Sequence, residues 1–117
     1  MADAQSLPPQ VQQQLQTLQA LNQQMQATAA QRGQFEAMKA ESEQALAALE
    51  SLPADAPVYR SVGALLVKEP SKQAAVDKLK EDLETLEIRV ARMQKQEQQL
   101  REQMGQLQAK LQAALKP

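Results

Sequence analysis

The clearest hydrophobic pattern in the chain lies in its C-terminal part, after residue 70. Apolar residues recur there at alternating steps of three and four, which is the period of a heptad seam. Ser71 stands just before the first apolar position, where its hydroxyl can cap a helix. The pattern predicts a helix over about residues 72–115. Its seam, in which Glu97 is the one charged member, is Val76, Leu79, Leu83, Leu86, Val90, Met93, Glu97, Leu100, Met104, Leu107, Leu111 and Ala114.

The N-terminal part shows a weaker form of the same pattern and predicts another helix over about residues 8–52. Ser6 followed by Pro8 and Pro9 marks its start, since proline is tolerated in the first helical turn. Two apolar series follow in different registers, so the winding is expected to change near Gly33, which lies between them. The first series is Val11, Leu15, Leu18, Asn22, Met25 and Ala29, and the second is Phe35, Met38, Ser42, Ala45, Leu49 and Leu52.

Between the two helices, about residues 57–69 have the composition of a β-hairpin. Valine, leucine and tyrosine suit strands, and Gly63 can take the positive φ of a two-residue turn. The predicted partners are Val62 with Leu65, Arg60 with Val67 and Tyr59 with Lys68.

Two strands alone are marginal in water, and each face of this ribbon mixes apolar with charged groups. We therefore expect the hairpin to form a subunit interface through Val58, Tyr59, Val62, Gly63, Leu65, Leu66 and Val67.

A hairpin midway between two helices of similar length makes the helices double back on each other. Folding the chain about Gly63 brings Leu15 opposite Leu111 and Met25 opposite Leu100, so the two seams meet. The predicted fold is therefore mainly α: a long antiparallel two-helix coiled coil with one β-hairpin at its closed end. We expect residues 1–117 to form a single domain with both termini at the free end.

Composition argues against catalysis. The chain has no Cys and no His, which excludes thiolate chemistry and the commonest metal ligands. Carboxylate pairs such as Glu81 and Glu84 fit a solvated helix surface, and the glycines are too scattered for a phosphate-binding loop. We expect no enzymatic activity, no catalytic residues, no cofactor and no metal.

Charge and hydropathy narrow the range of partners. The net charge is −1, and basic residues alternate with acidic ones without aromatic neighbours, which disfavours nucleic acid and anionic membranes. No apolar run approaches the length of a membrane span, and the first residues show no basic region followed by an apolar run, so we expect no signal segment. The first helix is rich in glutamine, but its regular apolar spacing favours a folded helix. We expect no membrane partner and a cytoplasmic location.

Glu97 allows two interpretations. Folding places it within a turn of Arg32, so it can pair across the helices, or with Arg101 four residues on. Alternatively, its side chain extends along the seam to water.

The free ends of the helices form a further candidate site. Their apolar side chains belong to the seams, whose closure should cover most of them. Helix ends fray at low cost, however, and splaying would expose leucines to an apolar client. We expect binding of unfolded clients through Pro8, Pro9, Val11, Leu15, Leu18, Leu107, Leu111, Ala114 and Leu115.

Three stretches carry a family resemblance: Leu7-Pro8-Pro9-Gln10-Val11-Gln12, then Pro57-Val58-Tyr59-Arg60-Ser61-Val62-Gly63 with Leu65-Leu66-Val67, then Leu83-Glu84-Thr85-Leu86-Glu87-Ile88-Arg89. They closely resemble a prefoldin subunit of the β type, over nearly the whole chain. The single hairpin fits that type, because the α type resembles a longer subunit with two hairpins.

The resemblance implies an ATP-independent co-chaperone. Four β-type and two α-type subunits would join their hairpins into β-barrels, from which six coiled coils would extend. The tips would hold non-native proteins and pass them to a chaperonin. The residues themselves leave an alternative open: a structural coiled-coil scaffold or tether that docks a single folded partner.

Overall fold

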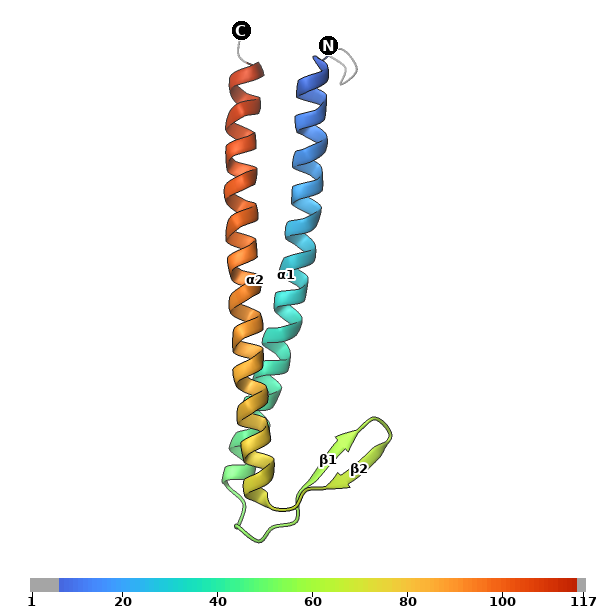
Figure 1. Cartoon of the computed structure of the whole chain (residues 1–117), viewed down its shortest axis with the longest axis vertical. Coiled ribbons are helices and arrows are strands. Elements are labelled where there is room, and N and C mark those ends of the chain that lie inside the picture. Colours follow the sequence, from blue (N-terminus) through green and yellow to red (C-terminus); the bar gives the residue numbers. More distant parts are fainter. Residues whose placement is uncertain (1–6, 116–117) are drawn as a thin grey trace. The chain divides into compact units, whose positions relative to one another are not determined.

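The computed structural model describes residues 7–115 of the chain, and most of them are helical. Helix α1 (Pro9–Glu50) is followed by strands β1 (Tyr59–Val62) and β2 (Leu65–Lys68) and by helix α2 (Lys72–Leu115) (Figure 1). These bounds confirm the mainly α class with one hairpin between two helices. Ser6, which was expected to mark the start of α1, lies outside the described residues.

The chain divides into two compact units, each containing part of both helices. The terminal unit consists, within the described residues, of residues 7–32 and 92–115, and the hairpin unit is Gly33–Ala91. In each unit a segment of α1 lies beside a segment of α2 (Figure 1). No stretch of the described helices is apolar enough, over the length required, to cross a bilayer.

The seam of α2 is the predicted one. Every seam position except Ala114 is buried or half-buried, while the residues between them are mostly exposed. The helix starts as expected, because the Ser71 hydroxyl accepts a hydrogen bond from the Ala74 N–H at 3.0 Å. The next residue contacts the end of α1 and the turn after it: Lys72 Nζ donates to the carbonyl oxygens of Glu50 at 3.4 Å and Leu52 at 2.6 Å.

The seam of α1 differs from the predicted one. The expected change of winding at Gly33 is wrong, because α1 is a single helix whose covered positions recur at three and four residues without a break. Polar residues, Thr28 and Arg32 among them, occupy seam positions that hydrophobicity alone does not reveal. The covered positions that follow this spacing are Val11, Gln14, Leu18, Leu21, Met25, Thr28, Arg32, Phe35, Lys39, Ser42, Leu46 and Leu49. Of the other predicted seam residues, Ala29 is half-buried, whereas Leu15, Asn22, Met38, Ala45 and Leu52 are exposed.

The hairpin has the predicted register. Tyr59 pairs with Lys68, Arg60 with Val67 and Val62 with Leu65 in an antiparallel ladder. Gly63 takes a φ of 58°, and no other described residue has a positive φ. This sign pattern, with glycine at the first central position, is that of a type II′ turn, which matches the twist of the flanking strands.

Substitution by alanine should change the free energy of unfolding in opposite directions at two of the glycines. Gly105 lies exposed within α2 with no atom within 4 Å of an added Cβ, so Gly105→Ala should raise the free energy of unfolding by about 0.5–1 kcal/mol. Gly63→Ala should lower it, since an L-residue at positive φ costs roughly 1 kcal/mol. Urea unfolding followed by circular dichroism, at one fixed chain concentration, measures both. Changes of the same sign in the free energy of unfolding of the two variants would contradict this prediction.

Candidate functional site

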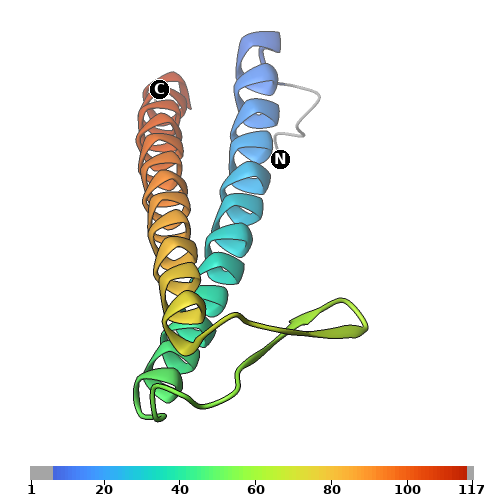
Figure 2. The same cartoon turned by 60° about the horizontal axis from the view of Figure 1, so that its bottom comes forward.

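The hairpin presents apolar side chains that its own chain does not cover. Both strands are exposed at every residue, and Leu65 and Leu66 are 68% and 73% exposed. The ribbon projects from the helices of the hairpin unit (Figure 2). Apolar side chains gathered at strands with free edges are typical of an interaction surface. Of the residues predicted for assembly, Val58 alone is half-buried within the chain.

A buried carboxylate anchors the base of this hairpin. Glu69 follows β2 and is 5% exposed, and its N–H donates to the Val58 carbonyl at 2.8 Å. Its Oε1 lies 3.3 Å from Arg60 Nε on β1, and its Oε2 accepts a hydrogen bond from Lys78 Nζ on α2 at 3.0 Å. The carboxylate therefore ties a strand to a helix. Sequence reasoning missed Glu69, because these three residues share no spacing pattern and meet only once the hairpin folds.

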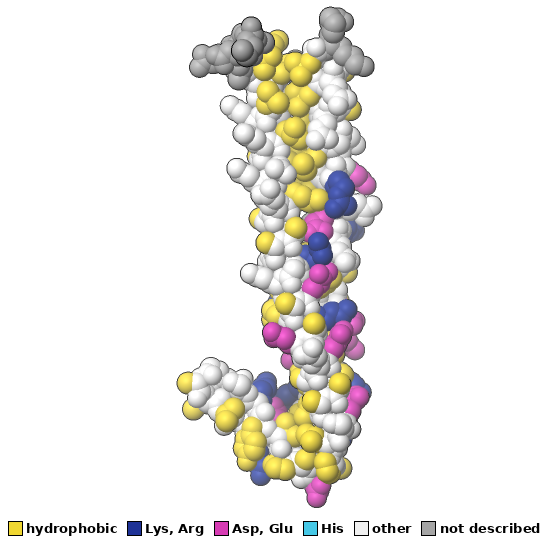
Figure 3. Space-filling view, turned by 180° about the vertical axis from the view of Figure 1, so that it is seen from behind, with side chains coloured by type: hydrophobic (Ala, Val, Ile, Leu, Met, Phe, Trp, Pro, Cys, Tyr) yellow, Lys and Arg dark blue, Asp and Glu magenta, His cyan; other side chains and the backbone are white. Residues whose placement is uncertain are grey.

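A groove of ≈ 370 Å³ lies between the hairpin base and the helices of the same unit. Its walls are mainly apolar and include Ala48, Leu49, Leu52, Tyr59 and Leu79. Hydrophobic side chains gather over this part of the molecule (Figure 3). The groove adjoins the exposed strands and extends the apolar surface that the hairpin offers.

In the terminal unit, the start of α1 lies beside the end of α2. One groove there is lined by Val11 and Gln14 from α1 and by Lys110 and Ala113 from α2. Among the residues described, Gln14 has the only buried side-chain N or O atom without a hydrogen-bond partner, its Oε1. The seam at this end therefore contains a polar group whose hydrogen-bonding capacity is not met within residues 7–115.

The predicted client-binding residues fall into two groups. Val11 and Leu111 are buried and Leu18 and Leu107 half-buried, as members of the seam. The others are already exposed without any splaying, Leu115 to 56%. The exposed members are Pro8, Pro9, Leu15, Ala114 and Leu115.

A larger groove of ≈ 710 Å³ lies farther along the terminal unit. Apolar side chains line it together with side-chain amides, and Figure 3 shows a hydrophobic strip between the helices in this region. Its lining residues are Gln12, Leu15, Gln16, Leu18, Gln19, Asn22, Met104 and Gln108.

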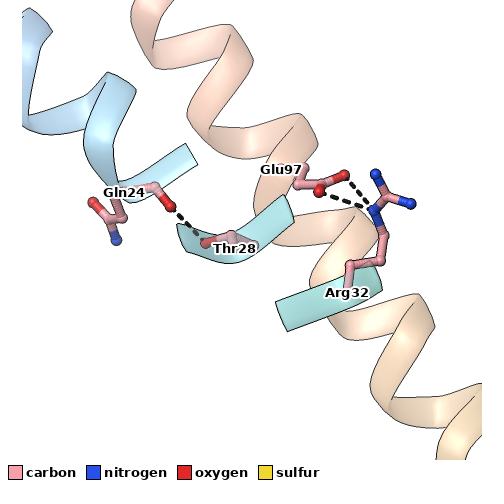
Figure 4. A network of polar contacts seen from close by, with 4 residues as sticks. All are labelled: Gln24, Thr28, Arg32 and Glu97. Carbon is pink, nitrogen blue, oxygen red and sulfur yellow. Dashed lines mark hydrogen bonds and ion pairs between the residues drawn. The ribbon is translucent and has the colours of Figure 1, made fainter. Parts of the chain in front are cut away.

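An ion pair joins the two helices within the terminal unit. Glu97 is 6% exposed, and Arg32 Nε donates to both of its carboxylate oxygens at 2.9 Å (Figure 4). The pairing with Arg32 is therefore confirmed, and the alternative in which Glu97 reaches water is wrong. Nearby, the Thr28 hydroxyl donates to the Gln24 carbonyl at 2.9 Å, so this buried hydroxyl is also satisfied.

The clusters of charged side chains within residues 7–115 join elements of the fold and do not form a metal site. Within residues 7–115, no group of three or more His, Cys, Asp or Glu side chains could hold a metal ion. The two clusters that do form, around Glu69 and Glu97, each connect one element of secondary structure to another. The candidate surfaces are thus the hairpin and the helix ends, both suited to binding polypeptide.

The family model that matches this chain and the relatives that match it belong to the same family. The family model described as "Prefoldin subunit" matches residues 12–117. The chain is 47% identical over 111 residues to the "Prefoldin subunit beta" of Archaeoglobus fulgidus, covering 95% of each chain. It is 49% identical over 111 residues to the protein of that name from Methanosarcina acetivorans, covering 95% of this chain and 94% of the relative.

Solved structures of prefoldin subunits also match this chain. The crystal structure of the prefoldin beta subunit from Thermococcus strain KS-1 matches with a TM-score of 0.86 at 44% identity, covering 94% of this chain and 96% of the other. The prefoldin beta2 subunit from the same strain matches with a TM-score of 0.69 at 21% identity, over 77% of this chain and 95% of the other, which shows a shared fold.

The ion pair predicts a non-additive stability effect. Glu97→Leu should lower the free energy of unfolding by about 1–3 kcal/mol, because it leaves the Arg32 guanidinium partly buried without this carboxylate. Adding Arg32→Met should restore most of the loss, since an apolar pair of similar volume fits a seam. A double-mutant cycle measured by thermal unfolding at fixed concentration tests both. Stabilisation by Glu97→Leu alone would show that the charge is dispensable.

Proposed function

Since this chain belongs to the prefoldin family of chaperone subunits, we propose that it assembles through its hairpin and holds non-native polypeptides at its helix ends. The observation that carries the proposal is the exposure of the hairpin's apolar side chains. A ribbon of this kind requires a partner, and family membership supplies the class of partner.

Assembly is driven by burial of the hairpin. Covering a leucine side chain fully is worth about 1.5–3 kcal/mol, and Leu65 and Leu66 are the most exposed large apolar residues within residues 7–115. Pairing the open strand edges with hairpins of other subunits satisfies their free N–H and C=O groups as well. The partners we propose are α-type prefoldin subunits and further copies of this chain, two of the former with four of the latter.

Client binding uses the exposed apolar residues of the terminal unit, among them Leu15 and Leu115. Association costs consume much of the energy of so few contacts, so one subunit binds weakly. Several subunits in one assembly raise the effective affinity without new contacts. Binding by apolar burial needs no ATP, and a chaperonin that offers a competing apolar surface can take over the client. We place this activity in the cytoplasm.

Assembly is tested on the two leucines of the hairpin. Leu65→Thr with Leu66→Thr keeps strand-forming residues but removes apolar surface, so it should lower the oligomer mass while helix content stays unchanged. Ile88→Thr is the matched control, since Ile88 is an exposed apolar residue on α2. Light scattering after size exclusion, alone and with an α-type subunit, measures the mass. An unaltered mass in the hairpin variant would place the interface elsewhere.

Client binding is tested at the helix ends. Leu15→Ser with Leu115→Ser removes apolar side chains that are 37% and 56% exposed in the single chain. The variant should assemble normally yet suppress the aggregation of a chemically denatured enzyme less well than the wild type. Ile88→Ser serves as the control and should protect like the wild type. Equal protection by all three proteins would contradict binding at this surface.

A further inference from the structure

The α1 wall of the larger groove in the terminal unit belongs to a segment without charged residues, whereas its α2 wall lies near Arg101, Glu102 and Lys110 in the sequence. Residues 7–31 contain no Asp, Glu, Lys or Arg, and every acidic residue of the described part lies between Glu36 and Glu102. None of the residues lining the groove is charged. In Figure 3 the upper part of the hydrophobic strip is bordered mainly by uncharged atoms, and charged side chains begin at its lower end.

The groove combines an apolar floor with a rim of amides. Leu15, Leu18 and Met104 supply the apolar surface. Gln16 and Gln19 line the same groove and are exposed, and their side-chain amides make no hydrogen bond to the described residues. Each amide carries two donors and one acceptor group, so this rim can both donate and accept.

We propose that this rim recognises the main chain of an extended client segment. The amides of Gln16 and Gln19 exchange hydrogen bonds with peptide N–H and C=O groups, while Leu15 and Met104 contact the client's apolar side chains. An extended segment fits this arrangement, because its main-chain groups are unpaired and its side chains alternate in direction. The inference rests on the proposed binding of clients at the helix ends.

This chemistry selects non-native over native surfaces. An amide that loses water without gaining a partner costs about 1–3 kcal/mol. An apolar patch on a folded protein has its main-chain groups already paired, so covering the rim with it would leave the amides unsatisfied. An unfolded segment supplies the missing partners. None of the lining residues is charged, so the groove lining itself favours neither sign of client charge.

Replacement of the two glutamines by methionine separates this proposal from simple apolar attraction. Methionine has a similar length and helix propensity but cannot exchange these hydrogen bonds. The probe is a fluorescent synthetic peptide of alternating leucine and serine, compared with its backbone N-methylated analogue by anisotropy. Gln16→Met with Gln19→Met in the full chain should weaken peptide binding by about three-fold or more and abolish the preference over the analogue.

The matched control is Gln23→Met with Gln26→Met, which has the same spacing on the same helix at exposed positions outside the grooves. It should bind the peptide like the wild type. Unchanged or tighter binding by the Gln16 and Gln19 variant would overturn main-chain recognition.

The variant Leu15→Ser with Leu115→Ser, measured with the same peptide, separates the proposed client site from the proposed recognition of the client's main chain. If it weakens binding while the methionine pair does not, clients bind at this surface without main-chain recognition. If neither variant weakens binding, the proposed client site and this inference both fail.

Discussion

Burial along one seam between two helices is the constraint from which the rest of this structure follows. Two packed helices enclose no interior, and among the described residues no large side chain is fully buried. Stability must then come from many partly covered residues spaced by three and four, as in the seam that contains Val76, Leu86 and Leu100. Helix propensity contributes, but it cannot by itself hold long helices in one arrangement.

A seam of this kind tolerates polar residues only when each finds a partner. The Glu97 carboxylate is paired with Arg32, and the Thr28 hydroxyl with a carbonyl of its own helix. Such a pair adds little net stability over an apolar pair, but it disfavours any shift that would separate the charges. In the hairpin unit, the Arg89 guanidinium lies 5.5 Å from the centre of the Phe35 ring, which offers a further contact across the helices.

The same lack of an interior explains both candidate surfaces. A helix pair has no second layer with which to cover a two-stranded ribbon, so Leu65 and Leu66 remain in solvent. Glu69, through Arg60 and Lys78, links the ribbon to its helices. At the helix ends, apolar groups such as Leu115 are exposed. For a subunit of the prefoldin family, surfaces left open in the single chain are available to other polypeptides.

The sequence by itself determined α2, the strand register and the turn, because each follows from rules that act over a few residues. Heptad spacing identifies the α2 seam, Ser71 its cap, and Gly63 the one position that needs a positive φ. The family resemblance is likewise visible in the hairpin residues and is confirmed by relatives of the β type.

Tertiary structure alone decided the seam of α1, the role of Glu69 and the choice between the two interpretations of Glu97. Arg32 and Thr28 lie on that seam because of what faces them or satisfies them, and a hydrophobicity pattern reads both as breaks. Glu69 gains its role only when β1 and α2 approach it. Which apolar residues at the helix ends are exposed, Leu115 but not Leu111, likewise depends on packing. Local rules place residues on a helix or strand, whereas the burial of a polar or terminal side chain depends on groups distant in the chain.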